Sequence, residues 1–296
     1  MKHVVKKRGP RHYFLPAPSR WPLTGSIGLF FLALSVGNFV HGNVIAHYFF
    51  FAGALFLAYM MFGWFSTVIE ESLAGSYNKQ IDRTYRWGMA WFIISEISFF
   101  GIFFGALFYV RMFAVPVLAG EIKPFSTHAL LWPKFQAAWP LLVNPNPAQF
   151  PGPSETISAL GIPALNTLLL LTSAVFITWA LWCLKQNKTK HMYWGVAITI
   201  LLGLCFLCMQ AYEYTEAYTE FNLKLSSGIF GTTFFMLTGF HAAHVTIGLT
   251  MLIVIFIRCI KGHFKPEHHF AFEAVSWYWH FVDVIWLFLF IFVYWL

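Results

Sequence analysis

The chain has 296 residues, of which 58% are hydrophobic and 10% are charged, and its formal net charge is +7. A soluble domain has about 45–50% apolar and about 25% charged residues, so this composition excludes an ordinary soluble fold. A net positive charge is also typical of proteins that bind nucleic acid. Basic residues beside membrane spans, however, set the orientation of the chain in the membrane, so we expect no nucleic-acid partner.

Seven apolar stretches follow one another along the chain. Each is long enough to cross a hydrocarbon core, which takes about 20 helical residues. They cover residues 21–40, 44–69, 87–110, 162–184, 193–212, 228–257 and 270–296. We therefore predict an all-α integral membrane protein with seven transmembrane helices.

Outside the spans lie a short amino-terminal arm, one long loop and several shorter connections. Residues 1–20 are predicted to be a cytoplasmic amino-terminal arm, and residues 21–296 the transmembrane domain. The loop of residues 111–161 carries eight of the fourteen prolines and shows no helical periodicity. Proline fixes the backbone and removes an amide donor, so we expect an irregular excursion on the outer face.

The basic residues lie unevenly on the two sides that these spans define. With the amino terminus in the cytoplasm, fifteen of the nineteen Lys and Arg residues fall on the cytoplasmic side. The outer side keeps Arg111, Lys123, Lys134 and Lys224, and the outer loop after the fifth span holds Glu213, Glu216 and Glu220. Because cytoplasmic loops carry the excess of Lys and Arg, we predict a cytoplasmic amino terminus and an outer carboxyl terminus.

Two acidic side chains, Glu96 and Asp283, fall inside predicted spans. A charge at the bilayer centre costs at least about 2.5–3.5 kcal/mol, so a membrane acid needs a partner, a proton or a function. A hydrogen bond between helices and a proton-related role both satisfy this requirement, and for Glu96 the sequence leaves both open.

Histidines accompany these acids. His241 and His244 are three residues apart on the sixth span, and His280 and Asp283 are three apart on the seventh, so each pair shares a helix face. We expect an intramembrane polar network of His241, His244 and His280 and no metal site.

The rival hypothesis is a membrane di-iron enzyme such as a desaturase, in which these histidines would ligate metal together with His263, His268 and His269. His241 lies roughly 25 Å from the cytoplasmic end of its helix, whereas His268 and His269 follow that end. The two groups therefore cannot share one cluster.

Arg86 and Arg258 mark the cytoplasmic ends of the third and sixth spans. Such cations anchor a span according to the positive-inside rule, and they also suit anionic lipid head groups. The sequence favours neither role over the other.

Four motifs occur in a characteristic order along the chain. They are RWGMAWFIISEISFF at residues 86–100, IPALNT at 162–167, the stretch at 210–217, and the specific tryptophan-rich WYWHFVDVIWLFL at 277–289. In these motifs the chain resembles subunit III of bacterial haem–copper cytochrome c oxidases, over residues 13–296.

The resemblance implies a two-helix bundle and a five-helix bundle with a lipid-filled cleft between them. It implies no haem or copper in this chain, because subunit I holds the haems and one copper centre, and subunit II holds the dinuclear copper that accepts electrons from cytochrome c. Subunit III of this family stabilises subunit I and supports proton uptake by the proton-translocating complex in the bacterial plasma membrane.

The resemblance also assigns residues. Glu96 matches the carbodiimide-reactive membrane glutamate, and no residue of this chain is expected to be catalytic. Side chains that fall where the family contacts phospholipid are Trp64, Glu71, Arg86, Arg258 and His263. The chain departs from the family pattern at Glu70, where arginine is common, and at Tyr77, near a usual histidine.

Two alternatives stand beside this interpretation. Subunit III of a quinol oxidase is typically shorter and has five helices. A transporter would also explain buried acids, but it usually shows internal repeats and broken helices, which this sequence lacks.

Overall fold

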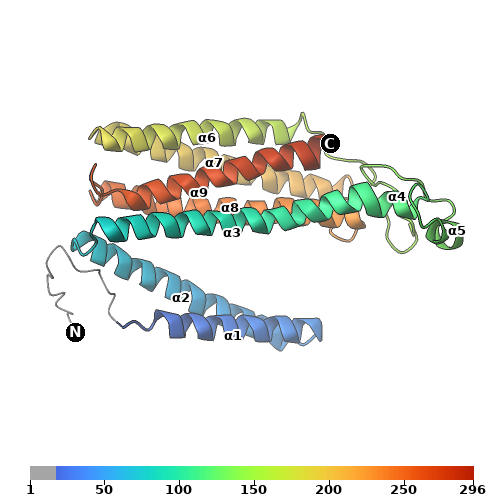
Figure 1. Ribbon diagram of the computed structural model, residues 1–296, viewed down its shortest axis with the longest axis horizontal. Coiled ribbons are helices and arrows are strands. Elements are labelled where there is room, and N and C mark those ends of the chain that lie inside the picture. The colour runs from blue at the N-terminus through green and yellow to red at the C-terminus, as the bar shows by residue number, and fades with distance from the viewer. Residues whose placement is uncertain (1–17) are drawn as a thin grey trace. The chain divides into compact units, whose positions relative to one another are not determined.

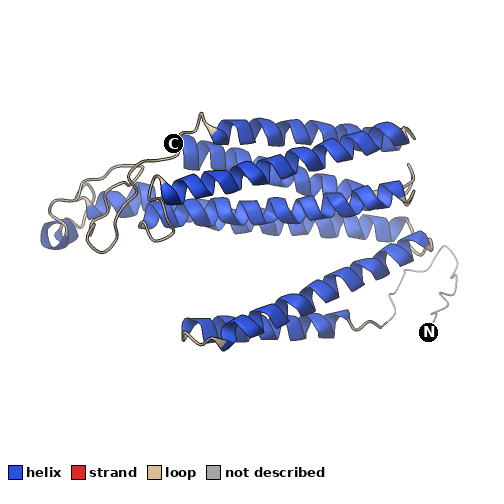
Figure 2. Cartoon of the chain, turned by 180° about the vertical axis from the view of Figure 1, so that it is seen from behind, coloured by secondary structure: helices blue, strands red, loops and turns tan. Residues whose placement is uncertain are grey.

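The computed structural model describes residues 18–296, so most of the predicted arm lies outside the described residues. Within residues 18–296 the regular structure is helical, apart from one isolated β-bridge between Lys265 and His268 (Figure 2). Seven helices in this range are long and apolar enough to cross a membrane, which confirms the predicted fold class.

The chain divides into two compact units at residue 87. The first contains α1 (Trp21–Val40), α2 (Ile45–Leu73) and the start of α3 (Lys79–Tyr109). The hairpin of α1 and α2 packs through small residues, since a Cβ added to Gly28 would lie 2.9 Å from Leu57 and one added to Gly53 would lie 2.9 Å from Leu32. Close approach through glycine is typical of helices packed in lipid.

The second unit begins at Gly88 and contains the rest of α3 together with four long helices. These are α6 (Ile162–Lys185), α7 (Thr189–Thr219), α8 (Ile229–Ile260) and α9 (Phe270–Leu289). Successive helices run in opposite directions (Figure 1). The turns at 186–188 and 261–269 therefore share one end, here called the basic end, and the connections at 119–161 and 220–228 share the other, here called the loop end.

This division agrees with the expected two-helix and five-helix bundles. The lipid-filled cleft between them stays a prediction.

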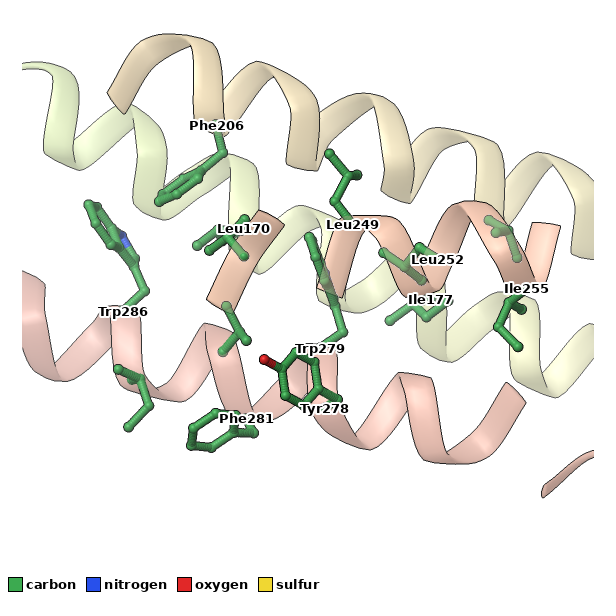
Figure 3. Close-up of a cluster of buried hydrophobic side chains, with 14 of the residues drawn as sticks. Leu170, Ile177, Phe206, Leu249, Leu252, Ile255, Tyr278, Trp279, Phe281 and Trp286 are labelled. Atoms are coloured by element: carbon green, nitrogen blue, oxygen red, sulfur yellow. The ribbon is translucent and has the colours of Figure 1, made fainter. Parts of the chain in front are cut away.

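The core of the second unit is built around two tryptophans of α9 (Figure 3). Trp279 is fully buried, and its indole N–H donates to Ser173 Oγ on α6 at 2.8 Å. Trp286 likewise donates to Thr167 Oγ1 at 2.9 Å. A buried indole needs such a partner, so each bond fixes where α9 sits against α6.

The helix that carries Glu96 extends further than the sequence predicts. After Tyr109 it passes through the π-helical segment η1 (Val110–Ala114) into α4 (Val115–Leu118), and a separate short helix, α5 (Ser126–Leu131), follows. The prediction of an irregular loop over 111–161 was therefore wrong for these segments. Pro116 stands near the start of α4, directly after the π-helical segment, and it has no amide hydrogen to donate to the preceding turn.

Candidate functional site

Glu96 on α3 and His244 on α8 meet across the second unit. Glu96 Oε2 lies 2.7 Å from His244 Nε2, and His244 Nδ1 lies 2.7 Å from the carbonyl oxygen of Phe240. The ring of Phe100 contacts the imidazole at 5.0 Å between centroids. Because a carbonyl only accepts, Nδ1 carries a hydrogen. One further proton is then shared between Nε2 and the carboxyl group.

His280 and Asp283 face a second helix. His280 Nε2 lies 3.1 Å from Thr178 Oγ1 on α6, while its Nδ1 is 3.8 Å from Asp283 Oδ2, too far for a hydrogen bond. Asp283 is buried, and neither of its carboxyl oxygens has a hydrogen-bond partner among the described residues. A charge on Asp283 would therefore be costly without a partner from elsewhere.

His241 lies in an aromatic pocket. Its ring centroid is 5.3 Å from that of Trp286 and 5.8 Å from that of Phe206. Within residues 18–296 neither imidazole nitrogen has a hydrogen-bond partner. The structure thus brings His244 together with Glu96 and places His280 near Asp283, but it leaves His241 outside these hydrogen bonds.

Sequence reasoning missed a fourth polar group near the loop end. Glu213 is completely buried, and its Oε1 accepts hydrogen bonds from Tyr294 Oη at 2.6 Å and from Gln210 Nε2 at 3.0 Å. Asn166 Nδ2 donates to Gln210 Oε1 at 3.4 Å. The sequence assigned Glu213 to the outer loop, but α7 continues to Thr219, so the i, i+3 spacing of Gln210 and Glu213 was the available signal.

Arg258 and His263 lie together at the basic end. The Arg258 guanidinium sits 4.5 Å from the centre of the Phe264 ring, and its Nε has no hydrogen-bond partner in the described part of the chain. The His263 backbone N–H donates to the Arg258 carbonyl at 3.0 Å. Burial, and then the positive charges of Arg258 and Lys261, lower the pKa of His263. A neutral imidazole thus lies beside a cation that is suited to a phosphate group.

The first unit holds the other predicted lipid contacts. Trp64 is 49% exposed, which suits an indole at a lipid interface. Glu71 Oε2 accepts a hydrogen bond from Tyr77 Oη at 2.9 Å, and burial is the main cause that raises the pKa of Tyr77. Arg86 Nε lies 2.9 Å from Asp82 Oδ2. These two charged residues therefore have partners within the unit, unlike the Arg258 Nε.

The arrangement as a whole links helices through polar side chains. Across residues 18–296 no three or more His, Cys, Asp or Glu side chains are grouped so as to hold a metal ion. Polar side chains instead join α3 to α8 through Glu96 and His244, and α6 to α9 through Thr178 and His280. Glu213 joins α7 to Tyr294 of the π-helical segment η2 (Phe290–Trp295). Such pairs hold helices in register in a medium where an unpaired polar group is costly.

Known proteins are similar in sequence to this chain along nearly its whole length. The profile of the family described as "Cytochrome c oxidase subunit III" matches residues 11–142 and 127–296. Proteins named cytochrome c oxidase subunit 3 from Equus caballus, Hippopotamus amphibius and Bos taurus are each 39% identical to the chain. Each alignment covers 96% of this chain and 96% of the relative.

Proposed function

This chain belongs to the cytochrome c oxidase subunit III family, and from that premise we propose its place and role in the oxidase. It is a subunit III of the terminal oxidase. The observation that carries this conclusion is an identity of 39% over 96% of both chains, together with a family match to residues 11–142 and 127–296, the range that contains all seven candidate spans.

Within the complex, this chain supports the redox subunits and holds no redox centre of its own. Subunit I would carry the haems and one copper centre, and subunit II the dinuclear copper that receives electrons from cytochrome c. The contribution of this chain is a rigid five-helix bundle whose helices are joined by Glu96 with His244 and by His280 with Thr178. Such a scaffold would stabilise subunit I and shape the entrance for protons.

Phospholipid is the proposed ligand of Trp64, Glu71, Arg86, Arg258 and His263. The support is chemical: Arg258 is buried and has no acidic partner among the described residues. Its positive charge also acts on the nearby His263, whose backbone N–H bonds to the Arg258 carbonyl. An anionic head group would supply the missing charge. Arg86 already binds Asp82, so its share in lipid binding requires that pair to open or to accept a bifurcated contact.

The proposed location is the bacterial plasma membrane, with the amino terminus in the cytoplasm. The charge distribution favours this orientation. The relatives named above are mammalian, so the bacterial source rests on the motifs alone.

A comparison of the oxidase purified with and without this chain tests the role. Without the chain, we expect an unchanged reduced-minus-oxidised haem spectrum and normal initial turnover. Proton uptake should then be less efficient at high pH, and activity should be lost sooner during turnover. Stoichiometric loss of haem or copper from an otherwise assembled complex would contradict the supporting role.

The same preparation distinguishes a cytochrome c oxidase from the alternative, a quinol oxidase. A cytochrome c oxidase should oxidise reduced cytochrome c, and the dinuclear copper should appear in metal analysis. Turnover with quinol alone would assign the chain to a quinol oxidase instead.

A further inference from the structure

An apolar groove runs along the second unit between α3 and α9, and none of the polar pairs above explains it. Its volume is about 880 Å³. Its walls include Ile97, Phe104 and Phe108 of α3, Val284 and Phe288 of α9, and Phe292 of the π-helical segment that follows α9. Among residues 18–296, the titratable side chains that line it are Arg111 and His280, and the last residue, Leu296, lines it as well.

The groove ends at a cation. From Ile93 to Arg111 the helix rises about 27 Å, close to the hydrocarbon thickness of roughly 30 Å. Arg111 therefore lies at head-group level at the loop end. Among residues 18–296 it makes no ion pair; its guanidinium lies 5.8 Å from the centre of the Trp139 ring. An apolar groove that ends at a cation without an ion-pair partner is complementary to a lipid with an apolar chain and an anionic head group.

The backbone is irregular at this same end. The two π-helical segments of the described chain, η1 (Val110–Ala114) and η2 (Phe290–Trp295), both border the groove, through Arg111 and Phe292. Short π segments are rare and are frequent at functional sites. Arg111 and Phe292 lie within these two segments, so the irregular backbone coincides with this end of the groove.

Two glycines form an open part of the groove. A Cβ added to Gly101 or Gly105 would meet nothing within 4 Å. Elsewhere in the bundle glycine makes room for a neighbour, since a Cβ on Gly203 would lie 2.7 Å from Trp279. Glycine weakens a helix, and the described chain offers no packing reason for it at 101 or 105.

We propose that this groove binds an anionic phospholipid, with its phosphate on Arg111 and an acyl chain along Gly101, Gly105 and the phenylalanines. The site is separate from Arg258 and His263, because those residues lie at the basic end and Arg111 lies towards the loop end. A transmembrane helix of a partner subunit is the competing occupant. It would leave the Arg111 charge against an apolar surface, which is costly in a membrane.

The test uses the whole oxidase in lipid nanodiscs that contain phosphatidylglycerol with a photoactivatable diazirine on one acyl chain. After illumination, mass spectrometry of peptides should locate the label within residues 104–112 and 284–296. Arg111→Gln should reduce this labelling about fivefold, the factor that corresponds to about 1 kcal/mol for one basic residue at a membrane surface. Arg111→Lys should retain most of it, and Arg258→Gln should leave it unchanged.

A second pair of variants fills the space without changing charge. Gly105→Leu should reduce the labelling, whereas Gly88→Leu, at another position where an added Cβ meets nothing within 4 Å, should not. A diazirine phosphatidylcholine should label these peptides several-fold less, and free inorganic phosphate should not compete. Absence of label from both peptides in the unaltered complex would mean that a partner subunit covers the groove. Equal labelling by both lipids, unaffected by Arg111→Gln, would reduce the groove to ordinary lipid-facing surface; either result overturns the proposal.

Discussion

The pair of Glu96 and His244 holds one shared proton in a hydrogen bond of 2.7 Å between α3 and α8. With Nδ1 committed to the Phe240 carbonyl, Nε2 either accepts from a neutral carboxyl group or donates to a carboxylate. Both arrangements join the same two helices. They differ in whether the proton can leave, which is the difference between a structural and a proton-active glutamate.

Glu96→Gln separates these roles. A glutamine amide can donate to Nε2 but cannot ionise, so we expect near-normal assembly and turnover. Glu96→Leu should lower the stability of the complex by about 1–3 kcal/mol, because it leaves Nε2 without a partner. Thermal dissociation of the chain and oxygen uptake measure both effects. A fully assembled Glu96→Gln complex with impaired proton uptake would instead show that Glu96 is proton-active.

Phospholipid at Arg258 and His263 should depend on pH. The pKa of His263 is lowered in the folded chain, so the imidazole is neutral at pH 7 and gains charge only as the pH falls below its unperturbed value of about 6.5. A bound phosphate would favour the charged form and raise that pKa. We therefore expect retained anionic phospholipid to stay constant between about pH 8 and about pH 7 and to increase as the pH falls below about 6.5.

Lipid extraction from the purified complex measures this dependence. Arg258→Gln should lower retention at every pH, and His263→Gln should abolish the pH dependence alone. Lys265→Gln is the matched control, because Lys265 is an exposed cation in the same connection after α8 and is not among the charges that lower the pKa of His263. Retention that is equal in all three variants would leave Arg258 as a topology anchor.

At the level of single residues, sequence reasoning found the polar groups but not their partners. Glu96 was recognisable because it interrupts an apolar span. His244 was recognisable too, but the bond between them joins residues 148 apart and no local pattern encodes it. Glu213 was missed for the opposite reason: three glutamates close together indicated a loop, although the first of them points into the bundle and meets Tyr294.

At the level of helices, the contact of α7, α8 and α9 depends on glycine notches around Trp279. A Cβ on Gly203 would lie 2.7 Å from the indole, and one on Gly248 would lie 3.0 Å from its other side. The ring is therefore held between two helix backbones and also bonded to Ser173. It cannot move away from one helix without striking the other.

Gly203→Ala should therefore destabilise the bundle. Overpacking of a filled core costs about 1–3 kcal/mol, which outweighs the gain of up to about 1 kcal/mol in helix propensity. Gly88→Ala gains the same propensity and meets nothing, so it should be neutral or slightly stabilising. Thermal release of the chain from the complex compares the two. Equal melting temperatures would show that Trp279 has room that the structure does not indicate.

Helix ends were the least predictable feature of the elements. The spans that were predicted to start at residues 21 and 270 do start there, because the sequence becomes apolar abruptly at both positions. The helix that starts as α3 continues through η1 and α4 to Leu118, and α7 continues to Thr219, beyond the predicted limits of 110 and 212. Hydropathy indicates only which residues lie in lipid, and a helix continues past them where its backbone hydrogen bonds are still satisfied. The short helices within 111–161 carry no apolar periodicity that could announce them.

At the level of the whole molecule, the alternating direction of the helices divides the basic residues between the two ends of the second unit. In the second unit the basic end holds the turns with Lys188 and Lys261, and the loop end holds Lys123, Lys134 and Lys224. The described residues contain seven candidate spans, so if each crosses the membrane, the residues before α1 and those after η2 lie on opposite sides. The orientation of the whole chain then follows from which end faces the cytoplasm.

Fusions of topology reporters test this orientation. Alkaline phosphatase, which is active only after export, should be active when fused after Leu296 and inactive when fused in the turn at 186–188. Green fluorescent protein, which fluoresces when it folds in the cytoplasm, should show the reverse. The excess of fifteen basic residues over four drives this result, and short basic loops resist translocation.

A truncation makes the same test independent of the amino-terminal arm. Removal of α1 and α2 deletes two spans, so the parity of the rest is unchanged and the reporter after Leu296 should stay active. The nine basic residues retained at the cytoplasmic ends of α3, α6, α7, α8 and α9 are sufficient for this, since they still outnumber the four outer ones. Cytoplasmic activity at Leu296 in the full chain would mean that one of the seven helices does not cross the membrane. Inversion in the truncated chain alone would show that the arm and the first hairpin set the orientation.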